Sequence, residues 1–160
     1  MKKLKLWFLT GILFTVLACD NETPEAVPTI DLAAESITYE LVSQDSKFTG
    51  TVSVKGVIKN VGGKFQSGQG QQYAALYQKP HGGQLKLLAK VDFQILEVGE
   101  SLQVSATAAW NVTTEFQPDF MLRIEYDPDI LIDGNKHNDD RNPANNSLTK
   151  SGYGINDLFE

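Results

Sequence analysis

A chain of 160 residues with 14 lysines and arginines against 20 aspartates and glutamates has a formal net charge of -6, and 41% of its residues are hydrophobic. Nucleic acid is excluded as an expected partner, because phosphate backbones are bound by clustered basic side chains and the basic cluster of this chain is confined to residues 1–6. The length is that of one domain large enough to bury its own core.

The first residues carry an export signal. Three lysines within the first five residues precede an apolar run over residues 6–17. A charged region followed by a hydrophobic region is typical of a secretory signal peptide. The run is shorter than the ~20 residues that a membrane-spanning helix needs, and Asp20, Asn21 and Glu22 prevent its extension. Residues 1–18 are therefore expected to be a signal peptide and not a membrane-spanning anchor.

The only cysteine of the chain stands directly after this run, in the order Val16-Leu17-Ala18-Cys19. This sequence resembles the bacterial lipobox, in which the cysteine is lipidated on its sulfur and becomes the first residue of the mature chain. The resemblance implies attachment to a membrane through a lipid on Cys19, and several acyl chains on one residue anchor a protein firmly. The alternative is a plain signal peptide followed by an unmodified cysteine. Loss of residues 1–18 would remove three lysines and no acid, and would change the formal charge to -9.

The residues after Cys19 suggest a tether and a location. Asp20, Glu22 and Glu25 resemble the acidic signals that send lipoproteins to the cell surface in some Gram-negative bacteria. Two prolines within residues 23–28 disfavour both a helix and a compact turn, so residues 19–29 are expected to form a flexible tether. The expected location is the cell envelope, as an outer-membrane lipoprotein that faces either the surface or the periplasm.

From Ile30 onward the apolar residues recur with a period of two, and clusters of Gly, Pro, Asn and Asp separate the runs. The pattern predicts strands near residues 37–41, 51–59, 73–77, 85–93, 102–110, 120–126 and 147–153. No window of ten or more residues after Cys19 has a helical period. Seven strands over about one hundred residues predict an all-β, immunoglobulin-like β-sandwich at residues 30–160.

The alternation also predicts which side chains face the core. Trp110 is expected to pack inside the sandwich and not to form a sugar-binding platform. In the third and fourth runs the predicted inward residues are Tyr73, Ala75 and Tyr77, then Leu85, Leu87, Ala89, Val91 and Phe93. Three further aromatic residues are candidates for exposed contacts, or else covers for an edge of the sandwich: Phe65, Tyr153 and Phe159.

Five short segments occur in an order that resembles CARDB domains. They are residues 50–62 (GTVSVKGVIKNVG), 75–77 (ALY), 99–101 (GES) and 124–129 (IEYDPD), and the pair Asn145-Asn146. CARDB domains are immunoglobulin-like modules of bacterial surface proteins that are associated with adhesion. The resemblance covers about residues 30–150, departs from the family at residues 130–141, and implies a non-catalytic protein with no catalytic residue to carry over.

Residues 127–146 concentrate oxygen-bearing side chains. Calcium takes six to eight oxygen ligands, so this segment is a candidate calcium site, and no other cofactor is expected. It does not match an EF-hand, because Leu131 occupies the fifth position counted from Asp127. The alternative is that these residues only form turns, which Asp and Asn favour. The candidate ligands are Asp127, Asp129, Asp133, Asp139 and Asp140. The two histidines, His81 and His137, lie in loops and are not expected to form a transition-metal site.

The expected function is that of a lipid-anchored, non-catalytic envelope module that binds a protein or glycan through loops at one end of the sandwich, residues 60–71 and 127–146 included. One alternative is a structural accessory lipoprotein that joins a larger envelope complex through a sheet edge. The other is a glycan-active enzyme, which would need a cleft with converging polar groups.

Overall fold

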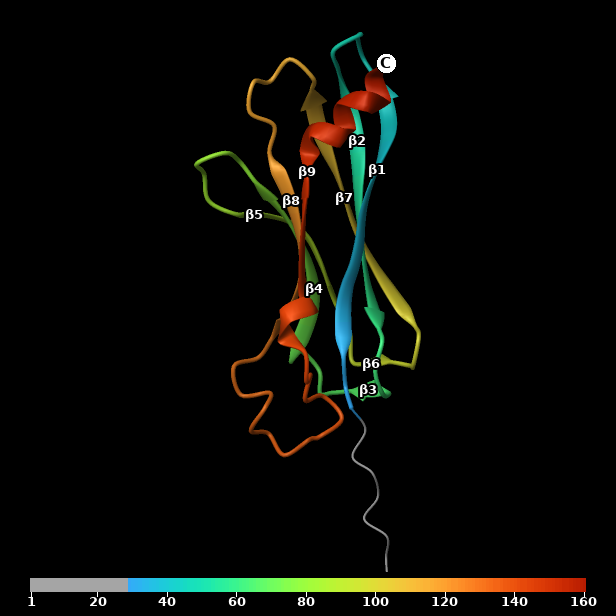
Figure 1. Ribbon diagram of the computed structural model, residues 1–160, viewed down its shortest axis with the longest axis vertical. Coiled ribbons are helices and arrows are strands. Elements are labelled where there is room, and N and C mark those ends of the chain that lie inside the picture. The colour runs from blue at the N-terminus through green and yellow to red at the C-terminus, as the bar shows by residue number, and fades with distance from the viewer. Residues whose placement is uncertain (1–28) are drawn as a thin grey trace, which may run out of the picture.

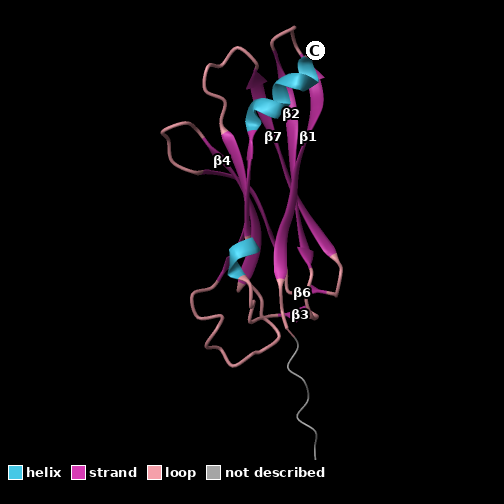
Figure 2. Ribbon diagram, viewed as in Figure 1, coloured by secondary structure: helices cyan, strands magenta, loops and turns pink. Residues whose placement is uncertain are grey.

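The computed structural model describes residues 29–160, which form nine strands and two short 3-10 helices (Figures 1 and 2). The expectations for the signal peptide, for Cys19 and for the tether up to residue 28 lie outside the described residues. The elements are β1 (Leu32–Gln44), β2 (Thr49–Asn60), β3 (Phe65–Gln66), β4 (Gln72–Lys79), β5 (Lys86–Asp92), β6 (Ile95–Leu96), β7 (Ser101–Asn111), β8 (Asp119–Tyr126), η1 (Pro143–Asn145), β9 (Ser147–Ser151) and η2 (Gly152–Phe159).

The seven longer strands build two antiparallel sheets that face each other (Figure 1). One sheet has the order β1-β2-β7, and the other has the order β5-β4-β8-β9. The two-residue strands β3 and β6 pair with each other at the lower end of the view. The predicted all-β, immunoglobulin-like sandwich of about seven strands is confirmed, and β3 and β6 are added to it.

Strand β2 shows why the alternation is informative. Side chains of a strand point alternately to the two faces of its sheet, so every second residue can be buried. Val52, Val54 and Ile58 are completely buried, whereas the intervening side chains are only half-buried. Gly56 shares this inward face, and a Cβ atom added there would lie 2.7 Å from Cδ1 of Leu122 on β8. The glycine therefore allows the two sheets to approach closely at this point.

One hydrophobic core fills the space between the sheets. Trp110 lies in it as predicted, and its Nε1 donates a hydrogen bond of 2.9 Å to Oδ1 of Asn156 on η2. Its indole also packs beside Phe120. The buried core residues are Ile30, Leu32, Ile37, Val52, Val54, Ile58, Phe65, Ala74, Leu76, Phe93, Leu96, Val104, Trp110, Phe120, Leu122, Ile124, Ile155 and Phe159.

The prediction that Tyr73 and Tyr77 of β4 face the core is wrong, whereas Ala75, predicted inward with them, is completely buried. Ala74 and Leu76 are buried in the core, whereas Tyr73 and Tyr77 are only half-buried and lie on the opposite face. Residues paired across a sheet share a face, and Leu76 pairs with Leu122 of β8, which points inward. Residues 74–76 are all apolar, so the sequence pattern is the same for either face, and the partner strand decides which face is buried.

The prediction for β5 is correct at one end and wrong at the other. Ala89 and Val91 pack against the core, and Phe93, just after the strand, is buried. Leu85 and Leu87 are exposed. Leu76 pairs with Ala89 but Tyr77 pairs with Leu87, so the register shifts between these pairs. A bulge of this kind moves the residues beyond it to the opposite face of the sheet.

The chain does not end in a strand to Tyr153, as predicted, because β9 stops at Ser151 and η2 follows. Gly152 makes this change of direction possible, since an added Cβ atom would lie 2.4 Å from the carbonyl oxygen of Pro118. Helix η2 then places Ile155 and Phe159 in the core. Phe159 is therefore not an exposed contact residue, so that alternative is wrong, and the alternative that its ring covers an edge of the sandwich is left.

The prediction for Phe65 is also wrong, because its side chain is completely buried. The ring packs against Phe93, with ring centroids 5.5 Å apart, where β3 pairs with β6. This contact joins residues far apart in the sequence, so the glycine-rich surroundings of Phe65 did not reveal it. Tyr153 is exposed, as expected for a candidate contact residue.

Candidate functional site

The chain enters the sandwich at one end, which we call the entry end: residues 29–31, 60–71, 97–100 and 127–146. Backbone hydrogen bonds hold these segments together. The N–H of Gly63 donates to the oxygen of Thr29 at 2.7 Å, and the N–H of Arg141 donates to the oxygen of Ile30 at 2.9 Å. The N–H of Gln66 donates to the oxygen of His137 at 3.0 Å. The two loops chosen from the sequence thus do share an end, and it is the end at which the chain enters (Figure 1).

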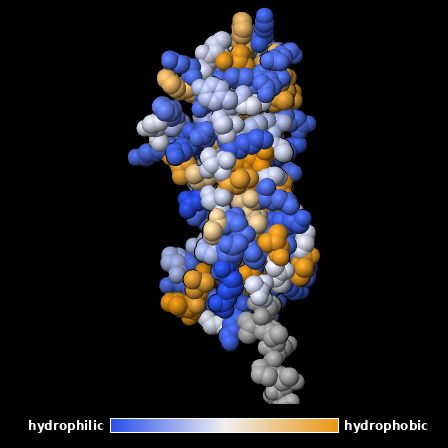
Figure 3. All heavy atoms as spheres, in the orientation of Figure 1, coloured by the Kyte–Doolittle hydropathy of each residue, from blue (hydrophilic) through white to orange (hydrophobic). Residues whose placement is uncertain are grey.

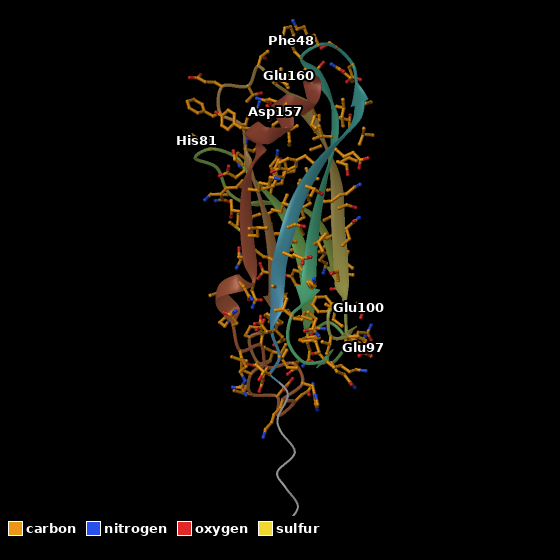
Figure 4. All side chains as sticks on the ribbon, turned by 45° about the vertical axis from the view of Figure 1, so that its right-hand side comes forward. Phe48, His81, Glu97, Glu100, Asp157 and Glu160 are labelled. Atoms are coloured by element: carbon orange, nitrogen blue, oxygen red, sulfur yellow. The ribbon has the colours of Figure 1, made fainter. Side chains whose placement is uncertain are left out.

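The opposite end, which we call the far end, consists of residues 45–48, 80–85 and 112–118 together with η2. Figure 4 shows Phe48, His81, Asp157 and Glu160 here, and Glu97 and Glu100 at the entry end. Strand β2 joins the two ends with 12 residues. At about 3.4 Å per residue in an antiparallel strand, the ends are separated by roughly 37 Å.

Aromatic rings gather on the far end. Phe48, Phe116 and Tyr153 keep 48%, 55% and 51% of their surface exposed. The His81 ring stacks on Phe116 with centroids 4.9 Å apart and planes 17° apart. The hydroxyl of Tyr153 donates a hydrogen bond of 2.7 Å to the oxygen of Glu115, which limits the movement of its ring.

A shallow hollow of about 370 Å³ lies beside the rings of His81, Phe116 and Tyr153, and Phe48 is not part of its lining. Its walls combine apolar rings with charged and amide groups, so they offer both stacking surfaces and hydrogen-bonding groups to a ligand. The lining residues are Lys79, Pro80, His81, Gly82, Phe116, Gln117, Asp119 and Tyr153.

Three of the five candidate calcium ligands accept hydrogen bonds, and a fourth, Asp139, forms an ion pair of 3.8 Å with Arg141. Asp127 accepts from the N–H of Asp129 at 2.9 Å, and Asp133 accepts from the N–H of Asn135 at 2.7 Å. Asp140 accepts from the hydroxyl of Tyr126 at 2.9 Å. The bonds from the backbone of Asp129 and Asn135 are those by which Asp and Asn stabilise turns. The calcium site stays a prediction, and the described residues show no cluster of three His, Cys, Asp or Glu side chains arranged to hold a metal ion.

Two ionisable groups, one in this loop and one at the end of β8, have shifted pKa values. The pKa of Asp133 is lowered, first by the hydrogen bond from the backbone of Asn135 and then by that from the amide of Asn138. The pKa of Tyr126 is raised, first by burial of the phenol and then by the nearby charge of Asp140. Both shifts follow from the general rules that hydrogen bonds to a carboxylate favour its charged form and that burial disfavours a phenolate.

The two histidines lie far from each other. His81 is at the far end in the stack with Phe116, and the backbone of His137 pairs with Gln66 at the entry end. They do not contribute to a common site.

The sequence reasoning missed Phe48 and Phe116. Each is a single phenylalanine inside a polar turn, within Ser46-Lys47-Phe48-Thr49 and Glu115-Phe116-Gln117. An apolar ring between polar neighbours in a loop is a signal for an exposed contact residue. What no local pattern shows is that both loops meet, which the hydrogen bond of 2.9 Å from the N–H of Val112 to the oxygen of Phe48 demonstrates.

A helix long and apolar enough to cross a membrane was sought in residues 29–160, and none is found there.

Comparison with known proteins identifies no family. No protein-family model and no curated protein matches the chain. Among solved structures, the chain is similar to part of beta-glucosidase 3B from Thermotoga neapolitana in two complexes. The complex with glycerol matches at 17% sequence identity and a TM-score of 0.34. The complex with glucose matches at 19% identity and a TM-score of 0.33. Each match covers 78% of this chain and 16% of the glucosidase chain, so this chain spans a small part of that protein's length. A likeness of this size carries no argument about function.

Proposed function

We propose that this protein is a lipid-anchored, non-catalytic binding module of the cell envelope whose far end contacts a protein or glycan ligand. The observation that carries the proposal is the polarity of the molecule. Thr29, the first described residue, lies at the entry end, whereas the exposed rings of Phe48, Phe116 and Tyr153 belong to the far end. The resemblance to CARDB domains supports the same kind of function.

The length of the tether determines how the module would be presented. Thr29 stands ten positions after Cys19 in the sequence. A fully extended chain spans at most about 3.5 Å per residue, so the entry end would lie within roughly 35 Å of the membrane. The far end would then lie roughly 37 Å further out along β2. We therefore assign ligand contact to the far end, in place of the entry-end loops that the sequence suggested.

The far-end surface has the chemistry of a contact site. Large aromatic side chains contribute much of the binding energy at protein interfaces, and they are costly to expose without a role. Figure 3 shows apolar surface at the upper end of the molecule, among hydrophilic side chains. Charged and amide groups around the hollow, such as Lys79 and Asp119, provide the polar rim that such contacts use.

The anchoring part of the proposal is tested by protease treatment of intact cells that produce either the wild-type chain or the Cys19→Ala variant. We expect the wild-type protein to stay with the membrane fraction and to be degraded on intact cells, and the variant to be released. A Cys19→Ala protein that remains bound to the membrane contradicts lipid anchoring. Protection of the wild-type protein until the outer membrane is opened would place it in the periplasm and favour the accessory role in an envelope complex.

The binding part is tested with purified residues 20–160 against immobilised extracellular matrix proteins and polysaccharides. The double variant Phe48→Ser, Phe116→Ser removes exposed rings at the far end. The matched control Ile95→Ser, Val98→Ser removes exposed apolar side chains near the entry end. We expect at least a tenfold weaker binding for the far-end variant and unchanged binding for the control. Equal effects of the two pairs, or no binding across the panel, would refute this assignment.

A further inference from the structure

Strand β7 forms one edge of its sheet, because within residues 29–160 it pairs with β2 alone. The backbone hydrogen bonds that the described residues make outside the sheets do not involve residues 101–110. Strand β5 of the facing sheet lies near β7, but the two are not hydrogen-bonded to each other. One row of backbone groups along β7 therefore has no backbone partner in the described part of the chain.

The hydrogen-bonding pattern identifies the groups of this row. Opposite residues of an antiparallel pair alternate between hydrogen-bonded and non-hydrogen-bonded pairs. The N–H of Val112 donates to the oxygen of Phe48, and the N–H of Asn60 donates to the oxygen of Glu100, at 2.9 Å each. The even-numbered residues of β7 therefore bond to β2, and the odd-numbered residues direct their backbone groups to the free side. Five residues each present one N–H and one carbonyl there: Ser101, Gln103, Ser105, Thr107 and Ala109.

The other three sheet edges are protected by bulges, charged side chains or covering elements, which are the usual means of preventing further strand pairing. Strand β1 has two bulges and lies against β9 and η2 (Figure 1). Nζ of Lys150 donates to the oxygen of Ile37 on β1 at 2.9 Å. Strand β5 has three charged side chains and a bulge against β4. Strand β9 has only five residues, and one of them is Lys150.

Strand β7 has none of these protecting features. Its 11 residues include no charged residue, no proline and no glycine. Its pairing with β2 has no register shift, so the edge is regular along its whole length. A long, regular edge without charge is a template for the addition of another strand.

We propose that β7 pairs in antiparallel orientation with β7 of a second copy of this chain, which joins two three-stranded sheets into one sheet of six strands. When the two strands overlap completely, Ala106 lies opposite Ala106 of the second copy on the two-fold axis. The odd-numbered residues then lie opposite one another, as their free backbone groups require. The central alanines form a non-hydrogen-bonded pair, in which the strands come closest, and their small side chains suit this approach.

The side chains of β7 suit a second copy on both faces of the joined sheet. On the solvent side the opposite residues are Ser105 and Thr107, Gln103 and Ala109, and Ser101 and Asn111, so no like charges meet. On the core side Leu102, Ala106 and Ala108 are only half-buried. Apolar residues of the second copy would lie opposite each of them, which removes more apolar surface from water.

The acidic character of the chain does not oppose this contact. The glutamates on the solvent side of the same sheet are paired with lysines of β2. Glu40 forms an ion pair with Lys55, and Glu35 forms one of 3.2 Å with Lys59. The outer face next to β7 therefore carries no excess charge that would repel the second copy.

The segment that precedes β1 is a poor alternative occupant of the edge. Residues 20–28 contain three acids and two prolines. Proline cannot donate to a strand ladder, and acidic residues are depleted in strands. A strand from an unrelated protein would need the uncharged alternation of polar and apolar residues that β7 itself supplies.

Antiparallel pairing places the entry end of one copy beside the far end of the other. With the lipid on Cys19, the two anchors would point in opposite directions, and the pair would join two facing membranes. This consequence rests on the proposed function. The pairing itself does not, because it needs neither the lipid nor a far-end ligand.

Cysteine crosslinking tests the pairing and its register. Residues 20–160 contain the whole described core and no cysteine. We expect Ala106→Cys to form a disulfide-linked dimer under mild oxidation, because Cα atoms of such a pair lie about 4.5 Å apart, within reach of a disulfide. The control Ala108→Cys is on the same face and is also half-buried, but it would lie roughly 14 Å from its counterpart. Crosslinking of both variants, of neither, or of the control alone would overturn the proposal.

Sedimentation equilibrium measures the pairing without a crosslink. We expect wild-type residues 20–160 to dimerise reversibly at submillimolar concentration. Thr107→Lys adds a charge on the solvent side of the edge and should weaken dimerisation tenfold or more. The control Ser53→Lys adds the same charge opposite Thr107 on β2, one strand away from the edge, and should change dimerisation less than threefold.

A wild-type chain that stays monomeric at one millimolar, or equal effects of the two lysine variants, would overturn the inference. Either result leaves the far-end proposal standing, because binding there is measured with other variants and with immobilised ligands. Loss of far-end binding, in turn, would leave the crosslinking of Ala106→Cys unchanged.

Discussion

The distance between the two sheets depends on Gly56, and the substitution Gly56→Ala tests this. The added methyl group would lie 2.7 Å from Cδ1 and 3.2 Å from Cδ2 of Leu122, where ordinary contacts begin at 3.4 Å. Gly56 does not have a positive φ angle, so steric contact, and not backbone strain, is the main cost. Leu122 is completely buried, which leaves its side chain little room to rotate away.

The expected magnitudes follow from this geometry. Overpacking of a close-packed core by one methyl group costs about 1–3 kcal/mol, so Gly56→Ala should lower the free energy of unfolding by that amount. Leu122→Ala should cost about 2–5 kcal/mol, because it leaves a cavity. In the double variant the new methyl group enters space that the leucine has left. The losses of stability in the two single variants should therefore sum to at least about 1 kcal/mol more than the loss measured in the double variant.

Urea unfolding measures these free energies, with the fluorescence of Trp110 as the probe. Trp110 is the only tryptophan in residues 20–160, and it is buried. Ser53→Ala, on the other face of β2, is the control and should change stability by less than about 0.5 kcal/mol. Additive costs in the double variant, with a coupling energy below about 0.5 kcal/mol, would refute the idea that Gly56 and Leu122 determine the spacing of the sheets.

Three further predictions concern polar groups. Asn60 is completely buried, its side-chain amide donates to the oxygens of Gly63 and Leu96 at 2.8 Å each, and its Oδ1 accepts from the N–H of Gly62 at 3.0 Å. Asn60→Ala should therefore lower the free energy of unfolding in urea by about 2–3 kcal/mol. A loss below about 0.5 kcal/mol would contradict this role. The pKa of Tyr126 is raised by burial and by the charge of Asp140, so the phenol loses its proton at a lower pH in the unfolded chain than in the folded one. The free energy of unfolding should therefore fall above about pH 10, by up to about 1.4 kcal/mol per pH unit for this group. Tyr126→Phe should make that fall shallower in unfolding experiments between pH 9 and 11, and an unchanged slope would argue against the burial of this phenol. We expect the Tm of the protein to be the same in EDTA and in millimolar calcium, because Asp127, Asp133 and Asp140 already accept hydrogen bonds from protein groups. A Tm that falls in EDTA would favour a calcium site in residues 127–146 instead.

Much of the fold could be predicted from local patterns. Alternation with a period of two is a direct consequence of strand geometry, so the seven longer strands and the inward faces of β2, β7 and β8 follow from the residues alone. Trp110 belongs to such a pattern, and its burial followed from it. The polar turns between the runs likewise marked the ends of most strands, although β1 extends beyond residues 37–41 and β9 stops at Ser151.

Other features depend on partners that are distant in the sequence. The inward face of β4 is determined by pairing with β8, and the exposure of Leu87 by the register shift against β4. Phe65 is buried because Phe93 meets it, although its own neighbours in sequence are polar or glycine. None of these contacts leaves a trace in a short window of sequence.

The same division holds for the candidate sites. Residues 127–146 were conspicuous in the sequence by their aspartates and asparagines, but composition does not reveal which of their oxygens accept turn hydrogen bonds and which are buried without a donor. His81 and Phe116 come from two different loops, and their rings stack only because the folded chain brings the two loops together. The sequence by itself determined the strands, because side-chain alternation is a local property of the backbone. Only the tertiary structure decided which loops meet, because strand pairing and sheet packing join residues that are far apart along the chain.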